Sequence, residues 1–205
     1  MNNFFGMIPS VLMIVSPILI TAVGGMICER SGVVNIALEG LMSIGAFAAA
    51  ATHVLLEGFF PGSIWVALLV GSLCGMLISV IHAFAAISLN ADQTVSGTGI
   101  NLLASGITVF FSQIIFRMDR TKPFQTGMMP GIFGIYPTAL IAIIVVLISW
   151  FVLYKLPFGL RLRACGEDPS VAASVGIKVK RTRYIAVLVS GFLAGLAGGC
   201  FVCTL

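Results

Sequence analysis

Apolar residues fill six long stretches of this chain, and polar residues gather in the segments between them. A helix needs about 20 predominantly apolar residues to cross the hydrocarbon core of a bilayer. We therefore expect an all-α fold, a polytopic transmembrane helical bundle forming one domain over residues 1–205. The predicted spans are approximately Met7–Ile27, Val33–Leu56, Ser63–Leu89, Val95–Phe116, Thr138–Tyr154 and Tyr184–Leu205.

Composition agrees with this pattern, since 59% of the 205 residues are hydrophobic and only 9% are charged. A soluble domain carries about 25% charged residues, so this chain lacks the surface of a water-soluble fold. A soluble globular domain, a disordered tail and a nucleic-acid-binding module are thereby excluded. The five cysteines lack the spacing of a disulfide framework or zinc site, and the two histidines lack metal-ligand spacing. We expect no metal, no cofactor and no catalytic residues.

The basic residues are unevenly distributed over the loops. Seven of the eleven Lys and Arg residues fall between Lys155 and Arg183, whereas the loop Arg117–Pro137 holds three. Because Lys and Arg accumulate on the cytoplasmic side of membrane proteins, we expect the loop Lys155–Arg183 to be cytoplasmic. Counting the spans back from this loop places both ends of the chain outside.

Polar residues also recur inside the second apolar stretch, where polarity is costly. Ser31, Asn35, Glu39 and Ser43 follow one another at every fourth position, which predicts one stripe along a helix. An ionised carboxylate within the membrane needs a partner or water. Two interpretations of Glu39 stay open: a hydrogen bond that holds two helices together, or a position beside a translocation path.

A second polar stripe runs through the fourth stretch. Its members, at steps of three or four, are Asn90, Thr94, Thr98, Asn101, Ser105, Thr108 and Ser112, and Asp92 is placed to cap the helix. Glycine pairs four residues apart, such as Gly71–Gly75 and Gly191–Gly195, predict close helix contact. Two polar stripes in one apolar chain favour a solute path. Its candidate residues are Asn35, Glu39, Ser43, Thr94, Thr98 and Asn101.

The basic loop contains a short helix with its own start and stop signals. Asp168 suits the N-cap, Pro169 the first helical position and Gly176 the residue just beyond the C-terminus. A helix of about seven residues does not persist alone in water, so we expect it to dock on a partner. The small residues Ala172 and Ala173 predict a smooth face for a partner groove. The basic residues on either side are expected to hold its ends at the lipid surface.

Three parts of the chain resemble one family of transporters. The first joins Arg163-Ala-Cys-Gly-Glu-Asp-Pro, Arg181-Thr-Arg-Tyr and Ser190-Gly-Phe-Leu-Ala-Gly-Leu-Ala-Gly; the others are Glu29-Arg-Ser-Gly-Val-Val-Asn-Ile-Ala-Leu-Glu-Gly and Leu89-Asn-Ala-Asp-Gln-Thr-Val-Ser-Gly-Thr-Gly-Ile-Asn. They resemble ABC importer permeases of the branch that handles branched-chain amino acids, simple sugars and nucleosides. Within it, the similarity is to nucleoside permeases that work with a Bmp-like lipoprotein.

The resemblance implies a multi-pass subunit of a heteromeric importer in the bacterial plasma (inner) membrane. The implied partners are an ABC ATPase, an extracytoplasmic substrate-binding lipoprotein and a second permease, the two permeases forming a heterodimer. It also implies that the cytoplasmic loop 157–183 holds a coupling helix, which contacts the ATPase through Glu167, Asp168, Pro169, Ala172, Ala173 and Gly176. The sequence has no G-x-x-x-x-G-K-[ST] phosphate-binding loop. We therefore expect a transporter subunit and no enzyme, with ATP hydrolysis on a separate chain.

Family members continue with further spans after the segment Gly191–Gly199, so the resemblance implies a permease that is incomplete at its C-terminus. The expected solute is a nucleoside. Alternatives are an ABC permease for branched-chain amino acids or simple sugars and, from a different class, an ATP-independent carrier or channel. The carrier or channel leaves the capped loop helix unexplained. A membrane enzyme is least favoured, because the chain contains none of the motifs of hydrolases or metalloproteases.

Overall fold

The chain is a bundle of long helices with two short helices at one end. The computed structural model describes residues 2–59, 62–123 and 136–204. Within these described residues, six helices are long and apolar enough to cross a membrane, and α3 continues into a π-helical turn, η1. The all-α fold and the six predicted spans are thus confirmed. In order, the elements are α1 (Asn2–Glu29), α2 (Leu38–Leu56), α3 (Ser63–Ala83), η1 (Phe84–Ser88), α4 (Gln93–Phe116), α5 (Pro137–Lys155), α6 (Pro157–Glu167), α7 (Pro169–Ser174) and α8 (Val179–Thr204).

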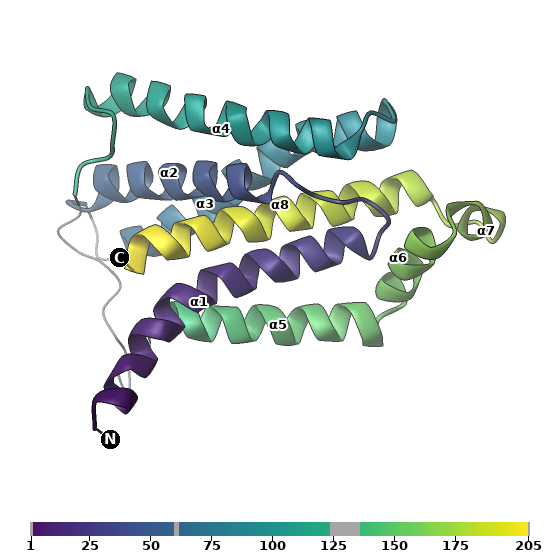
Figure 1. The fold of residues 1–205 in the computed structure, drawn as a ribbon, viewed down its shortest axis with the longest axis horizontal. Helices are drawn as coiled ribbons and strands as arrows, with labels where there is room; N and C mark the ends of the chain where they lie inside the picture. Colours follow the sequence, from purple (N-terminus) through teal and green to yellow (C-terminus); the bar gives the residue numbers. More distant parts are fainter. Residues whose placement is uncertain (1, 60–61, 124–135, 205) are drawn as a thin grey trace.

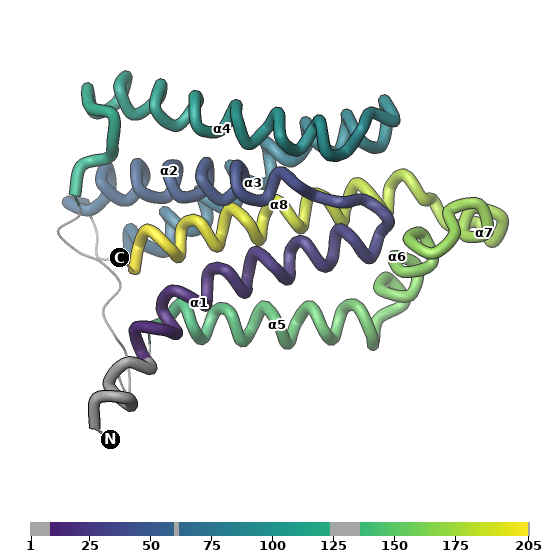
Figure 2. The backbone as a smooth tube through the Cα atoms, in the orientation of Figure 1, coloured from purple at the N-terminus to yellow at the C-terminus, as the bar shows by residue number. Residues whose placement is uncertain are grey.

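Helix α8 lies at the centre of this bundle (Figure 1). It packs against α1, α2 and α3, while α4 lies on α2 and α5 lies on α1. Figure 2 shows α6, α7 and the connections 30–37 and 89–92 gathered at one end, opposite the last turns of α2, α4 and α8. We call this end, formed by residues 30–37, 89–92 and 155–178, the basic end.

Glycines allow α8 to take the central position. A Cβ atom on Gly195 would lie 2.5 Å from the carbonyl oxygen of Gly71, and one on Gly75 would lie 2.6 Å from that of Gly191. Gly45 of α2 meets the backbone of Gly195 in the same way. Side chains at these positions would push the backbones apart, so the close helix contacts predicted from the glycine pairs are confirmed.

Helix α2 begins later than the apolar pattern predicts. Residues 33–37 are not helical. Gly32 has a φ of +82°, which turns the chain out of the helical path after α1. The side chain of Asn35 accepts a hydrogen bond from the backbone N–H of Ala37 (3.1 Å), and this bond stabilises a non-helical backbone. The predicted stripe is therefore wrong as a single helical face, because α2 contains only two of its members, Glu39 and Ser43.

Helix α4 begins at a side-chain cap, as predicted. The carboxylate of Asp92 accepts hydrogen bonds from the backbone N–H groups of Val95 (3.1 Å) and Thr94 (2.7 Å). Both bonds favour the ionised carboxylate and hold the pKa of Asp92 below its usual range. Asn90 lies before the cap with a φ of +52°, so the polar stripe of α4 begins at Thr94 instead.

Candidate functional site

The basic loop forms two helices, where the sequence predicted only the second. Pro157 takes the first helical position of α6. Gly159 lets α6 turn directly off α5, because a Cβ atom there would overlap the last carbonyl oxygens of α5. Leu162 and Cys165, three residues apart, are fully buried against the bundle. A proline followed by this helical spacing is the signal that would have identified α6.

Helix α7 has the start and stop signals that the sequence predicts. Oδ1 of Asp168 accepts hydrogen bonds from the Ser170 hydroxyl (2.6 Å) and from the backbone N–H groups of Val171 (3.2 Å) and Ser170 (2.8 Å). These bonds, the hydroxyl first, lower the pKa of the Asp168 carboxyl. At the other end the backbone N–H of Gly176 donates to the carbonyl of Ala173 (3.0 Å), with a glycine φ of +84°.

The six residues of α7 present a different face from the one expected. Ala172 is only 2% exposed and packs inward, so it secures the helix to its own chain. Val171 and Val175 are 59% and 71% exposed, and Ala173 is also exposed. The remaining candidates for ATPase coupling, Glu167, Asp168, Pro169 and Gly176, are exposed as well, except for the atoms used in the cap. The exposed surface of α7 and its C-cap therefore combines apolar Val171, Ala173 and Val175 with Ser170 and Ser174, and it has an acidic rim.

Arg183, a basic residue of the loop, points into the protein and not to the lipid surface. Its guanidinium donates hydrogen bonds to the carbonyl oxygens of Ser31 (3.1 Å) and Cys165 (3.2 Å). Gly32 and Gly166 lie at the same place, where a Cβ on Gly32 would be 2.9 Å from Nη2 of Arg183 and 3.2 Å from Cα of Gly166. We call these five residues the Arg183 junction. It joins the end of α6 and the start of α8 to the connection before α2.

Two asparagine side chains hold that connection to the bundle. The Asn35 amide donates to the hydroxyl of Ser190 on α8 (2.9 Å). Asn101 of α4 donates to the carbonyl of Ile36 (3.0 Å) and accepts from the backbone N–H of Gly40 (2.8 Å). Both amides act as structural anchors in this conformation, and sequence reasoning missed Ser190, a lone hydroxyl in an apolar run.

His82, one of the two histidines, is a packed residue. It is fully buried at the end of α3. One ring nitrogen lies 3.0 Å from the hydroxyl of Ser96 on α4, and the other lies 3.2 Å from the carbonyl oxygen of Val34. His82 thus ties α3 and α4 to the connection before α2. Nearby, the Gln93 side chain accepts a hydrogen bond from the backbone N–H of Val34 (2.7 Å).

The other four path candidates are exposed on two helices. Glu39 and Ser43 lie one turn apart on α2, and Thr94 and Thr98 lie one turn apart on α4. Glu39 makes no hydrogen bond or ion pair with any residue in the described ranges, so it does not join helices within this chain. On the helical wheel of α2, Glu39 and Ser43 lie between Gly40, which contacts α4, and Met42, whose sulfur accepts from α1. An exposed polar surface thus lies between α1 and α4.

Chemistry that needs a metal has no support in the part of the chain that the structure describes. No three His, Cys, Asp or Glu side chains come together there in a way that could hold a metal ion. The site instead consists of an exposed helix at the basic end, a hydrogen-bonded junction behind it and a polar surface on α2 and α4.

Known proteins are similar to this chain over nearly its whole length. The family model described as branched-chain amino acid transport system / permease component matches residues 7–205. The chain is 44% identical to the guanosine ABC transporter permease protein NupQ of Bacillus subtilis, with 97% of this chain and 67% of the relative covered. It is 37% identical to the nucleoside ABC transporter permease protein NupC of Lactococcus lactis, with 98% and 68% covered.

A more distant relative carries a different solute in its name. The chain is 32% identical to TsgC13 of Haloferax volcanii, a proposed glucose ABC transporter permease protein, with 94% of this chain and 61% of the relative covered. No solved structure matches the chain. The family match and the six spans agree with the permease resemblance found in the sequence. The chain belongs to the family described as branched-chain amino acid transport system / permease component. It is a multi-pass plasma-membrane permease subunit of the ABC transporter class, and membership of this class implies an ATPase and a substrate-binding partner.

Proposed function

We propose that this chain is a permease subunit of an ATP-driven importer of nucleosides. The support for the solute comes from two relatives, at 44% and 37% identity, whose names specify guanosine and nucleosides. The glucose permease at 32% identity supports a sugar as the second candidate. An ATP-independent carrier gains no support from these relatives, because all three are ABC permeases.

The observation that carries the coupling role is the exposed face of α7. A six-residue helix does not hold itself together in water, yet α7 is capped at both ends and presents Val171 and Val175 to solvent. Exposed apolar side chains on a rigid, capped helix are typical of a protein contact. We assign this face, with Glu167 and Asp168 at its rim, to a groove of the ATPase on the cytoplasmic side.

The Arg183 junction gives the coupling helix a route into the bundle. Helix α7 follows α6 directly, and the last turn of α6 contributes Cys165 and Gly166 to the junction. The junction continues to the connection before α2, which Asn35 fixes to α8 and Asn101 fixes to α4. A displacement of α7 by the ATPase would therefore reach three membrane helices through hydrogen-bonded contacts.

The polar surface between α1 and α4 is assigned to the solute path. The exposed carboxylate of Glu39 is costly against lipid, so a second permease subunit and water are the surroundings that fit it. We propose that a related second permease covers this surface, that the path runs between the two subunits, and that an extracytoplasmic lipoprotein delivers the solute. Asn35 and Asn101 contribute by holding the path's wall, since their amides are engaged within the chain.

The coupling role is tested by disrupting α7 in the assembled importer. Asp168→Ala with Ala173→Glu removes the cap and places a charge on the exposed face. We expect uptake and solute-stimulated ATP hydrolysis to fall to background, because the ATPase no longer binds α7. Membrane insertion of the permease should stay normal. Lys180→Gln, an exposed change outside this face, is the control and should leave uptake normal. Normal ATP-dependent uptake by the double variant would contradict the assignment.

The solute is tested by competition in cells that carry the importer. Uptake of labelled guanosine is measured with excess unlabelled adenosine, glucose or leucine. We expect nucleosides to compete and the other two to leave uptake unchanged. Competition by glucose and not by nucleosides would show that the solute is a sugar. It would not affect the proposed role of α7 in coupling.

A further inference from the structure

The basic residues near α6 and α8 fall into two groups. The first group is engaged within the chain: the Lys155 ammonium lies 5.6 Å from the ring centre of Trp150, and Arg163 lies 5.0 Å from that of Tyr154. Arg183 donates to two carbonyl oxygens. The second group comprises Arg161, Lys178, Lys180 and Arg181, all exposed, and none of their side chains pairs with a residue in the described part of the chain.

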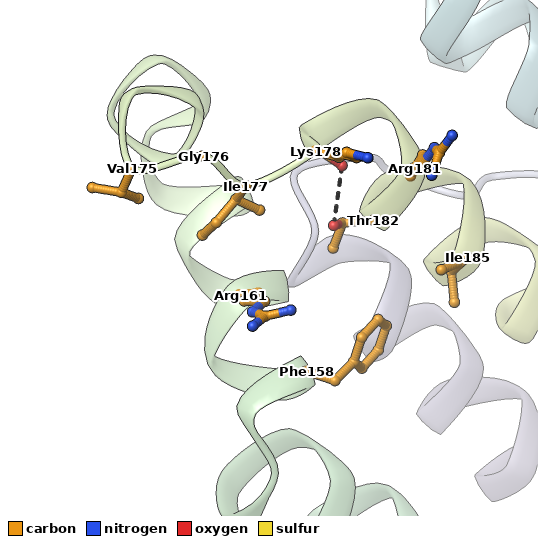
Figure 3. Close-up of a pocket in the computed structure, with 9 residues that line it drawn as sticks. All are labelled: Phe158, Arg161, Val175, Gly176, Ile177, Lys178, Arg181, Thr182 and Ile185. Atoms are coloured by element: carbon orange, nitrogen blue, oxygen red, sulfur yellow. Dashed lines mark hydrogen bonds between the residues drawn. The ribbon is translucent and has the colours of Figure 1, made fainter.

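Three members of the unpaired group line one cavity. It has a volume of about 390 Å³ and lies between the first turns of α6, the connection from α7 and the first two turns of α8. Figure 3 shows Arg161 and Phe158 on α6 facing the α8 side of the cavity, where Lys178, Arg181 and Ile185 lie. Three basic residues and no acidic residue line the cavity, so its surroundings are net positive.

The cavity lies at the level where two membrane spans meet water. Helix α5 ends at Lys155 and the span of α8 begins at Val179, and the cavity is between these ends. Its wall toward the membrane is apolar: Phe158 is half-buried, and Ile185 is 45% exposed nearly two turns into the span. A ligand that fits has an anionic head at the water boundary and hydrocarbon below it.

We propose that this cavity binds the phosphate head group of an anionic phospholipid, with the acyl chains along Phe158 and Ile185. Basic pockets beside membrane helices recognise such head groups through their charge. Free phosphate would satisfy the cations but leave the apolar wall exposed. An acidic side chain of the ATPase, which we place against Val175 and Gly176 at the outer wall, would likewise satisfy the cations and leave Ile185 without an apolar neighbour. The lipid would tie the end of α7 to the membrane independently of which solute the importer carries.

Two lysines two residues apart provide a matched test. Lys178 lines the cavity, whereas the exposed Lys180 does not. The importer carrying Lys178→Gln or Lys180→Gln is purified in detergent micelles containing phosphatidylglycerol and phosphatidylcholine, and the retained lipid is measured by mass spectrometry. We expect Lys178→Gln to lower retained phosphatidylglycerol about fivefold, since each surface lysine contributes about one kcal/mol to such binding, and Lys180→Gln to lower it less than twofold.

A conservative variant and a second ligand distinguish lipid binding from misfolding, from phosphate binding and from contact with the ATPase. Lys178→Arg keeps the charge and is expected to retain phosphatidylglycerol, which a misfolded protein would not do. Inorganic phosphate at millimolar concentration is expected not to raise the thermal midpoint of the importer, whereas phosphatidylglycerol raises it. Equal lipid loss in Lys178→Gln and Lys180→Gln, equal stabilisation by inorganic phosphate, or loss of the ATPase from Lys178→Gln with unchanged lipid would each overturn the proposal.

Discussion

Helices α8 and α4 are both apolar enough to span a membrane, but they have opposite surroundings. In the most apolar part of α8, 61% of the residues are buried within the chain, against 22% for α4. Glycines bring α8 into backbone contact with α2 and α3. The glycines Gly99 and Gly106 of α4 have open space beside them, and its Thr94 and Thr98 are exposed.

This difference separates what holds the subunit together from what it offers to partners. The small residues of α8 pack within the chain, whereas Gly99 and Gly106 of α4 remain available for contact with a partner. Composition alone does not distinguish the two helices, because both mix glycine, hydroxyl and aliphatic residues. The distinction depends on which neighbouring helices each one contacts.

The largest effect is expected when one glycine on each of the two helices is replaced. Gly195→Leu on α8 would place a side chain against the carbonyl oxygen of Gly71, 2.5 Å from its Cβ position. We expect a loss of more than about 3 kcal/mol and little folded protein, because neither backbone has room to move. Gly106→Leu on α4 is the matched control and should change the thermal midpoint little. Equal yields of monodisperse protein from both variants would contradict the comparison.

A smaller effect is expected at the Arg183 junction, where α8 leaves the membrane. Arg183→Gln removes a charged donor from the carbonyl oxygens of Ser31 and Cys165. We expect a loss of about 1.5–3 kcal/mol, the usual range for hydrogen bonds to charged groups. Lys180→Gln, an exposed change on the same turn, should leave stability unaltered. Thermal unfolding measures both, and indistinguishable midpoints would show that the junction does not stabilise the fold.

A third test compares two hydroxyls. Ser190→Ala on α8 leaves the buried amide of Asn35 without its acceptor, at an expected cost of about 1–3 kcal/mol. Thr98→Val on α4 removes a hydroxyl that bonds only to its own helix, at the carbonyl of Thr94 (2.9 Å). We expect Thr98→Val to keep the thermal midpoint and to reduce uptake in the assembled importer. A lowered thermal midpoint for Thr98→Val with an unchanged midpoint for Ser190→Ala would show that α4, and not α8, makes the stabilising contacts within the chain.

The smallest effect concerns the caps of α4 and α7. The pKa values of Asp92 and Asp168 are lowered in the folded chain. A lowered pKa means that each cap contributes above the unfolded value, near pH 4, and is lost as the pH falls through the folded value. Hydrogen exchange at Ser170 should therefore be constant from pH 8 to pH 5 and accelerate, after correction for intrinsic rates, only below about pH 4. In Asp168→Asn this acid acceleration should be absent.

The long spans and the capped helix α7 could be predicted because their signals are local. Twenty apolar residues suffice for a span, and Asp168, Pro169 and Gly176 encode both ends of α7 within nine positions. The start of α2 could not be predicted in this way. Besides its local hydrogen bond to Ala37, Asn35 donates to Ser190, 155 positions further on, and no periodicity within the segment records that contact.

The candidate site residues also divide into those that local sequence signals predict and those that depend on distant contacts. Exposure of Glu39 and Thr98 agrees with the polarity that first indicated them, and their place in the solute path stays a prediction. The inward position of Ala172 and the internal hydrogen bonds of Arg183 were hidden, because a small residue and a basic residue each have plausible positions on either side of a helix.

Two glycines at the basic end share one backbone geometry but set different limits on natural variation. Gly32 and Gly176 have φ values of +82° and +84°. Nothing lies within 4 Å of a Cβ atom built on Gly176, so asparagine, which tolerates this conformation, can replace it. At Gly32 the guanidinium of Arg183 already occupies the space, and in a saturation library no other residue should survive selection for uptake there.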